Sequence, residues 1–203
     1  MPQPTVYVLD DDVDVLRATE RLLFAAGIPV AAFQSAGAFL AACGKTSQGC
    51  VVVDLAMPGM SGMDVQRALA ERGNPLPVIF LTGRGDIRTC ADVMKHGAVD
   101  FLTKPVDEAE LLAAVSSALA LDEAQTRERA TRERNARALE TLTEREREVL
   151  HHVVSGRLNK QIAADLGTTE RTIKFHRGNL MRKLGIRTVA ELVRMAAGGA
   201  TTH

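Results

Sequence analysis

The fold is decided by residues 50–62, which run Cys50-Val51-Val52-Val53-Asp54-Leu55-Ala56-Met57-Pro58-Gly59-Met60-Ser61-Gly62. The small and β-branched apolar residues before Asp54 predict a buried parallel strand, and the Pro-Gly pair after it predicts a turn. Asp54 therefore lies at the carboxyl end of a strand, where open α/β sheets bind ligands. A carboxylate is costly to bury there unless a cation or a reaction uses it. We expect Asp54 to be the centre of the functional site.

The composition is that of a globular protein with one large domain or two small ones, since 203 residues include 46% apolar and 25% charged side chains. No apolar run approaches the roughly 20 residues that span a bilayer, and the first four residues lack the features of a signal peptide. The chain has three cysteines and no C-x-x-C spacing, which predicts buried thiols in a reducing compartment. We expect a cytoplasmic protein with no membrane partner.

The charge of the chain is zero overall but unevenly distributed. Residues 1–121 carry nine Lys or Arg against fourteen Asp or Glu, whereas residues 140–203 carry eleven against seven. An acidic front half and a basic tail indicate two domains with different partners. We therefore predict one domain over 1–121, a linker over 122–139 and a second domain over 140–203.

In the front half, short apolar runs alternate with amphipathic patterns. Strands are expected at 5–9, 29–33, 50–54, 77–82 and 99–102. Helices are expected at 13–26, 35–42, 61–71 and 86–96, with a fifth beginning after Asp107. This alternation predicts an α/β fold with a doubly wound parallel sheet, whose strand order the sequence leaves open.

Between the two predicted domains, residues 119–140 contain no Gly or Pro, many good helix formers and few apolar side chains. This composition favours a solvated helical linker over a dimerising coiled coil. The coiled coil would need sustained apolar a and d positions, which Ala124, Ala130 and Leu139 supply only weakly.

The tail has the pattern of a small all-α domain. Thr143 and Glu146 predict a capping box at the start of a helix that ends near Gly156. Further helices are expected at 159–167, 169–184 and 188–197. A short helix, a tight glycine turn and a longer basic helix predict a helix-turn-helix.

Polar side chains follow four of the predicted strands: Asp10 with Asp11, Asp54, Thr82 and Lys104. Each alone is weak, because an Asp run after a strand is usually a helix cap and a Lys-Pro pair is usually a turn. The carboxyl ends of parallel strands open on one edge, so together these groups can converge. Carboxylates that converge need a cation, and Mg²⁺ is the hard divalent ion that oxygen ligands favour. The lysine and the threonine could then hold a phosphoryl group arriving at Asp54.

Four motifs carry these side chains: Leu9-Asp10-Asp11-Asp12, Asp54 to Gly62, Leu81-Thr82-Gly83 and Lys104-Pro105. They resemble the receiver domain of two-component response regulators over residues 5–120. The resemblance implies a CheY-like (flavodoxin-like) five-stranded domain in which a sensor histidine kinase phosphorylates Asp54. It also implies that Lys104 pairs with the phosphoryl group and that the Lys104-Pro105 bond is cis. The implied Mg²⁺ ligands are Asp10, Asp11, Asp54 and the backbone carbonyl of Ala56.

The same resemblance implies a switch. A phosphoryl group adds nearly two negative charges, so Thr82 would turn to hydrogen-bond it and Phe101 would move inward. Two positions depart from the family pattern: Arg88 follows Ile87 where relatives have Pro, and Ala56 cannot position a hydrolytic water. We therefore expect at most slow autodephosphorylation and no other enzymatic activity.

Three motifs of the tail, at 143–150, 159–163 and 172–177, resemble the LuxR-type (NarL/FixJ) helix-turn-helix domain over residues 140–198. Helical spacing predicts that Ile173, His176, Leu180 and Leu184 pack inward, with His176 a packed residue and not a metal ligand. It predicts that Arg171, Lys174, Phe175, Arg177 and Gly178 face outward.

Promoter DNA is the partner that this tail implies. Lys174 and Arg177 are candidates for guanine edges, and other cations would contact phosphates. The expected DNA-contacting residues are Lys160, Arg171, Thr172, Lys174, Phe175, Arg177, Arg182 and Lys183. Gly178 either weakens the helix or lets DNA approach the backbone closely, and the sequence leaves both open. So small a domain is expected to bind as a homodimer, through 188–197 in the family, and RNA polymerase is a possible further partner.

Two alternatives stay open beside a phosphorylation-controlled transcription factor. An Mg²⁺-dependent phosphohydrolase could use the same acids, although such enzymes usually need a second acid where this chain has Ala56. A DNA-binding protein that ignores phosphorylation is disfavoured by the intact acidic motifs.

Overall fold

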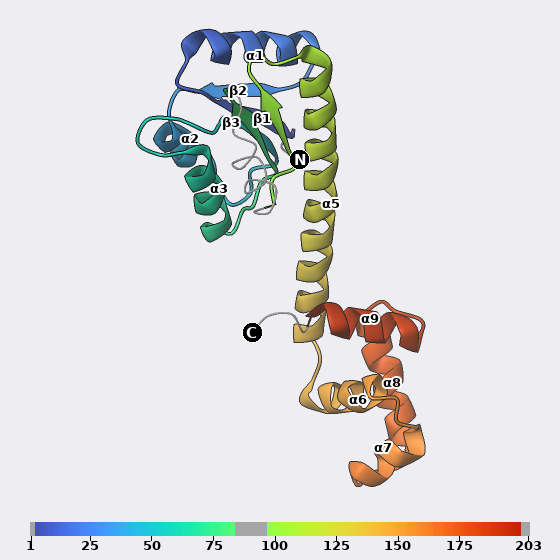
Figure 1. Ribbon diagram of the computed structural model, residues 1–203. Helices are drawn as coiled ribbons and strands as arrows, with labels where there is room; N and C mark the ends of the chain where they lie inside the picture. The colour runs from blue at the N-terminus through green and yellow to red at the C-terminus, as the bar shows by residue number, and fades with distance from the viewer. Residues whose placement is uncertain (1–2, 84–96, 200–203) are drawn as a thin grey trace. The chain divides into compact units, whose positions relative to one another are not determined.

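The structure is a computed structural model that describes residues 3–83 and 97–199, and it contains two compact units, Met1–Thr126 and Arg127–His203 (Figure 1). The helix expected over 86–96 lies outside the described residues, as do Arg88 and Cys90. In the described part of the chain, no helix is long and apolar enough to cross a bilayer.

The first unit contains the expected parallel sheet. Its strands are β1 (Thr5–Leu9), β2 (Val30–Phe33), β3 (Gly49–Asp54), β4 (Val78–Thr82) and β5 (Asp100–Thr103). They are ordered β2-β1-β3-β4-β5, and every neighbouring pair is parallel. The central strand β3 is buried along its whole length, as its β-branched run predicts.

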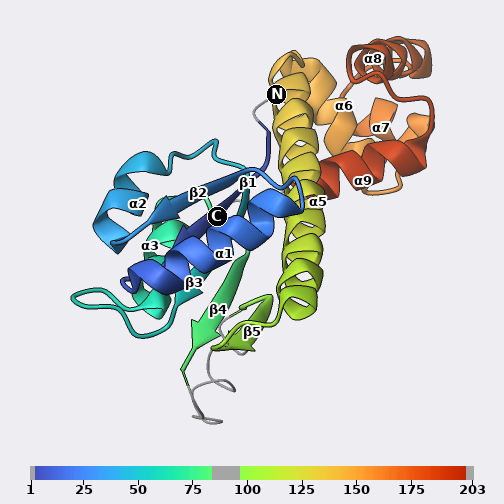
Figure 2. The same cartoon turned by 90° about the horizontal axis from the view of Figure 1, so that it is seen from above.

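Helices cover both faces of the sheet (Figure 2): α1 (Val13–Ala25), α2 (Ala36–Ala42), α3 (Gly62–Glu71) and α5 (Glu108–Glu140). Alternate residues of β3 divide between two cores. Val51 and Val53 pack with α2 and α3, whereas Cys50 and Val52 pack with α1 and the first turns of α5. The doubly wound α/β prediction is confirmed.

Helix α5 continues without a break through the expected linker, residues 122–139. Its Asp122 is buried and accepts a hydrogen bond from the backbone N–H of Gly49 at the start of β3 (2.8 Å). Gly49 has φ 125°, and a Cβ there would lie 1.9 Å from the carbonyl oxygen of Thr5, so only glycine fits. Burial, with a smaller contribution from the charge of Asp122, raises the pKa of the Cys50 thiol to about 12. The helix is thus tied to the amino end of the strand that carries Asp54.

We expect Asp122→Ala to destabilise the first unit by about 1–3 kcal/mol, because it leaves a buried N–H without its acceptor. Asp122→Asn is the matched control, since its amide oxygen can still accept from Gly49. Chemical denaturation followed by circular dichroism measures the loss, and hydrogen exchange at Gly49 locates it. Equal stability of the alanine and asparagine variants would contradict this role.

The second unit contains four further helices in the described part of the chain: α6 (Glu144–Val154), α7 (Asn159–Asp165), α8 (Glu170–Lys183) and α9 (Val189–Gly199). Their core includes Val149, Ile162, Ile173, Leu180 and Leu192. The expected capping box of Thr143 and Glu146 is present. Gly167 follows the C-cap of α7 with φ 60°, as the predicted glycine stop of that helix requires.

Candidate functional site

Three carboxylates meet at the carboxyl edge of the sheet, as the sequence predicts. Asp10 follows β1 and is fully buried, Asp54 ends β3 and is 8% exposed, and Asp11 is exposed. One ligand oxygen from each lies within 4.8 Å of the others. Asp12, the last member of the triplet, instead caps α1 by accepting hydrogen bonds from the N–H groups of Asp14 and Val15.

Lys104 joins two of these acids. Its Nζ lies 2.6 Å from Oδ2 of Asp10 and 3.0 Å from Oδ2 of Asp54. Burial alone would lower the pKa of Lys104, but its contacts with the two carboxylates outweigh burial and raise it. Lys104 therefore stays charged and neutralises part of the negative charge of the pocket.

Asp10 keeps a lone pair free for a further cation. Burial raises the pKa of Asp10, against the lowering effect of Lys104 and of the N–H of Asp12, which donates to Oδ1 (3.0 Å). Oδ2 of Asp10 forms an ion pair with Nζ of Lys104 (2.6 Å). No other group in the described residues donates to this buried oxygen. An oxygen-rich, acidic and incompletely satisfied pocket fits a hard divalent cation such as Mg²⁺.

Two predicted switch residues lie on the neighbouring strands. Thr82 ends β4 and pairs in register with Thr103, and its hydroxyl donates to the carbonyl of Gly83 (2.9 Å). Phe101 on β5 is 37% exposed. Ala56 is exposed beside Asp54, and its N–H donates to Oδ1 of that residue (3.3 Å). The Lys104-Pro105 bond is cis, as the resemblance implies.

The turn after Asp54 is held by a close approach of backbones. The N–H of Gly62 donates to the carbonyl of Leu55 (3.2 Å), and a Cβ on Gly62 would lie 2.6 Å from the carbonyl oxygen of Asp54. The ring of Phe80 would lie 3.1 Å away. Glycine at the start of α3 therefore lets the helix pack directly against the end of β3, the strand that carries Asp54.

Gly62→Ala is expected to lower the free energy of unfolding by about 1–3 kcal/mol, because α3 must move off the strand to make room for the methyl group. Gly37→Ala, within α2, is the matched control. A Cβ there meets nothing within 4 Å, so this change should be neutral or stabilising by up to about 1 kcal/mol. Thermal unfolding of the two variants distinguishes them, and similar melting temperatures would refute the close contact.

In the second unit, helix α8 has a buried face and an exposed face. Ile173, Leu180 and Leu184 are buried, and His176 is half-buried with its ring 5.7 Å from that of Phe175. The inward prediction is thus confirmed for the three aliphatic residues. The exposed residues along α8 and at the start of α7 are Lys160, Arg171, Lys174, Phe175, Gly178, Arg182 and Lys183, and Thr172 is half-buried beside them.

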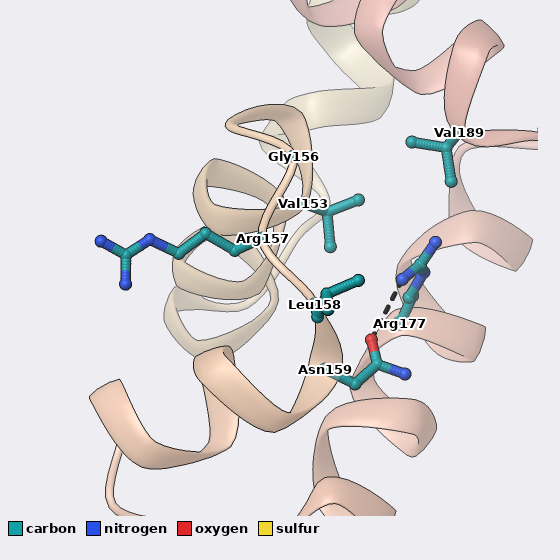
Figure 3. Close-up of a pocket in the computed structure, with 7 residues that line it drawn as sticks. All are labelled: Val153, Gly156, Arg157, Leu158, Asn159, Arg177 and Val189. Carbon is teal, nitrogen blue, oxygen red and sulfur yellow. Dashed lines mark hydrogen bonds between the residues drawn. The ribbon is translucent and has the colours of Figure 1, made fainter.

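The prediction that Arg177 faces outward is wrong. Arg177 is half-buried, and its guanidinium donates to Oδ1 of Asn159 at the start of α7 (3.0 Å; Figure 3). Arg177 lies four residues after Ile173 and three before Leu180, so it shares the buried side of the helix. These two spacings were visible in the sequence, but the partner Asn159 was not predicted.

Lys183 also has a partner within its own unit. Its Nζ lies 2.7 Å from Oε2 of Glu146, a buried carboxylate that also accepts from the N–H of Thr143. The hydrogen bonds from Lys183 and Thr143 lower the pKa of Glu146. This lysine therefore stabilises the packing of α6 against α8, a role that the sequence did not indicate.

Comparison with known proteins gives two family matches and several full-length relatives. The family described as "Response regulator receiver domain" matches residues 6–116, and that described as "Bacterial regulatory proteins, luxR family" matches residues 140–196. Response regulator protein TmoT of Ectopseudomonas mendocina is 44% identical over 95% of this chain and 88% of its own. Transcriptional regulatory protein FixJ of Azorhizobium caulinodans is 41% identical over 94% and 90%.

Two solved structures cover almost the whole chain. The structure of response regulator StyR has a TM-score of 0.84 and 40% identity, covering 97% of this chain and 99% of its own. Full-length FixJ from B. japonicum has a TM-score of 0.59 and 35% identity, with complete coverage of both chains.

Proposed function

Because this chain belongs to the response regulators that join a receiver domain to a LuxR-type DNA-binding domain, we propose that a sensor histidine kinase phosphorylates it on Asp54 to control its binding to promoter DNA. The observation that carries the proposal is the convergence of Asp10, Asp11 and Asp54 around the ammonium of Lys104. We propose that residues 1–121 form the receiver domain, residues 122–139 a helical linker and residues 140–203 the DNA-binding domain.

The phosphoacceptor chemistry follows from the pocket. An oxygen of the Asp54 carboxylate attacks phosphorus, the P–N bond to the kinase histidine breaks, and a P–O bond forms. Lys104 is already 3.0 Å from Oδ2 of Asp54, so it can neutralise the transferred group without moving far. An Mg²⁺ ion held by Asp10, Asp11, Asp54 and the carbonyl of Ala56 would neutralise further charge on the phosphoryl oxygens.

The proposed switch uses Thr82 and Phe101, whose side chains are not held firmly in their present positions. Among the residues that the structure describes, the Thr82 hydroxyl donates to the adjacent Gly83 carbonyl, so it can turn to a phosphoryl oxygen at small cost. That rotation would vacate space for Phe101, whose ring is exposed in this structure. The face of the receiver around Phe101 would then change, which is the change that we propose favours a homodimer.

Release of the phosphoryl group is expected to be slow, because Ala56 offers no side-chain group to position a water molecule. We expect the phosphorylated protein to persist far longer than seconds, and Ala56→Asn to shorten its lifetime by supplying an amide that can bind water. The decay of label after removal of the phosphodonor measures both lifetimes. Loss of label from the parent protein within seconds would refute the expectation, and multiple turnover of phosphodonor would favour a phosphohydrolase instead.

DNA binding is assigned to the exposed side of α8 and to Lys160 on α7. Five cations are exposed there and suit contacts with phosphates and guanine edges: Lys160, Arg171, Lys174, Arg182 and Lys183. Two such helices in a homodimer, joined through α9, would contact paired half-sites. RNA polymerase is a further proposed partner on the promoter.

Footprinting on genomic fragments with and without acetyl phosphate tests the proposed function. We expect paired protected segments whose occupancy rises when the phosphodonor and Mg²⁺ are present, and no such rise for Asp54→Asn. Protection of equal strength in both conditions would instead indicate a DNA-binding protein that ignores phosphorylation.

A further inference from the structure

The exposed side of α8 has an apolar centre. Phe175 is 63% exposed, although Ile173 and Leu180 of the same helix are fully buried. Helical spacing places it between Arg171, four residues earlier, and Gly178, three residues later. Apart from a contact with the ring of His176, this large aromatic side chain is left in water beside an exposed arginine, so its surroundings point to a partner.

Gly178 leaves bare backbone beside that ring. It lies inside α8, where glycine weakens a helix relative to alanine. Neither a left-handed φ nor a crowded neighbour requires it, since a Cβ there would meet nothing within 4 Å. The space next to Phe175 is therefore open, and the helix stability lost there is unexplained by the fold.

Arg177, two residues after Phe175, lies on the opposite side of α8 from that ring. Arg177 donates to Asn159 and lines a cavity of about 260 Å³ together with Val153 and Val189 (Figure 3). This hydrogen bond holds the guanidinium toward α7, on the side of α8 that carries Ile173 and Leu180. Lys174 and Arg171 are the exposed cations near Phe175 in the described part of this helix.

We propose that Phe175 and Gly178 together form a contact site for the 5-methyl group of thymine in the major groove. That methyl group is the apolar feature that distinguishes thymine there, and apolar side chains such as Phe contact it. The bare backbone at Gly178 lets the base edge approach, while Lys174 lies beside the site to contact a neighbouring base or phosphate. This inference rests on the proposed DNA binding. Arg177 has a structural role in it, since its hydrogen bond with Asn159 joins α8 to α7.

Uracil substitution in a bound DNA site tests the contact without changing any hydrogen-bonding edge. Binding sites are first selected from random duplexes with the full-length protein in acetyl phosphate and Mg²⁺, and each thymine is then replaced by deoxyuridine in turn. Burial of one methyl group implies about fourfold weaker binding at the contacted thymine. For Phe175→Ala the same replacement should have no effect, whereas Arg177→Ala should keep the fourfold difference.

Gly178→Ala provides a second test, because a glycine with only a structural role would not affect DNA binding. We expect this variant to melt at a higher temperature and yet to bind the selected duplex several-fold more weakly. Circular dichroism confirms that Phe175→Ala remains folded, as its exposure leads us to expect. If DNA is selected but no thymine position responds to uracil, or if Gly178→Ala binds as well as the parent, the inference fails and the proposed function stands. If no duplex is selected at all, the proposed function itself fails.

Discussion

Asp54→Asn is expected to take up no label from acetyl phosphate or from a histidine kinase. The amide nitrogen and oxygen of asparagine cannot form the acyl phosphate, while the near-identical shape leaves the fold intact. Asp10 and Asp11 each place a carboxylate oxygen within 4.8 Å of one from Asp54. Asp10, however, is fully buried, and Asp11 forms no ion pair with Lys104 among the described residues. We therefore expect no transfer to a neighbouring acid.

The matched control is Asp14→Asn, which removes an exposed carboxylate from the first turn of α1. It should be labelled as fully as the parent protein. Labelling is measured by the mass of the intact protein, which rises by one phosphoryl group. An Asp54→Asn protein labelled to the same extent as the parent would show that the acidic pocket is not the phosphoacceptor site.

Replacement of three exposed cations, Lys160, Arg171 and Arg182, by alanine is expected to have the second large effect. If each contacts one phosphate, the slope of log affinity against log salt should become less steep by about 2.7. If the variant and the parent bind equally at about 1 M salt, this corresponds to about 500-fold weaker binding at about 0.1 M salt. The loss should be similar for specific and random duplexes, because phosphate contacts carry no sequence information.

The control for charge alone is a triple alanine replacement of Arg129, Arg134 and Arg137 on α5, outside the helix-turn-helix. It removes the same number of positive charges and should change the salt slope little. Binding titrations at several salt concentrations give both slopes. Equal slopes for the two triple variants would contradict the assignment of the α7 and α8 cations to the phosphate backbone.

The sequence by itself predicted the strands and helices of the described residues, and the edge of the sheet at which the polar side chains gather. The apolar runs predicted all five strands, and the residues after them placed Asp10, Asp11, Asp54, Thr82 and Lys104 at one edge, because parallel strands share a direction. Local capping chemistry was equally direct, since Thr143 and Glu146 are three residues apart and find each other within one turn.

Only the tertiary structure decided the strand order and the pairs that join distant segments. Asp122 meets Gly49 across 73 residues, and Lys183 meets Glu146 across 37. Arg177 likewise donates to Asn159 on another helix, which places it on the buried side of α8 and not on the outward side that was predicted. The physical reason is that periodicity shows which side of an element is apolar. The partner of a polar side chain at the border of that side depends on which other element packs there, and on how the two are aligned.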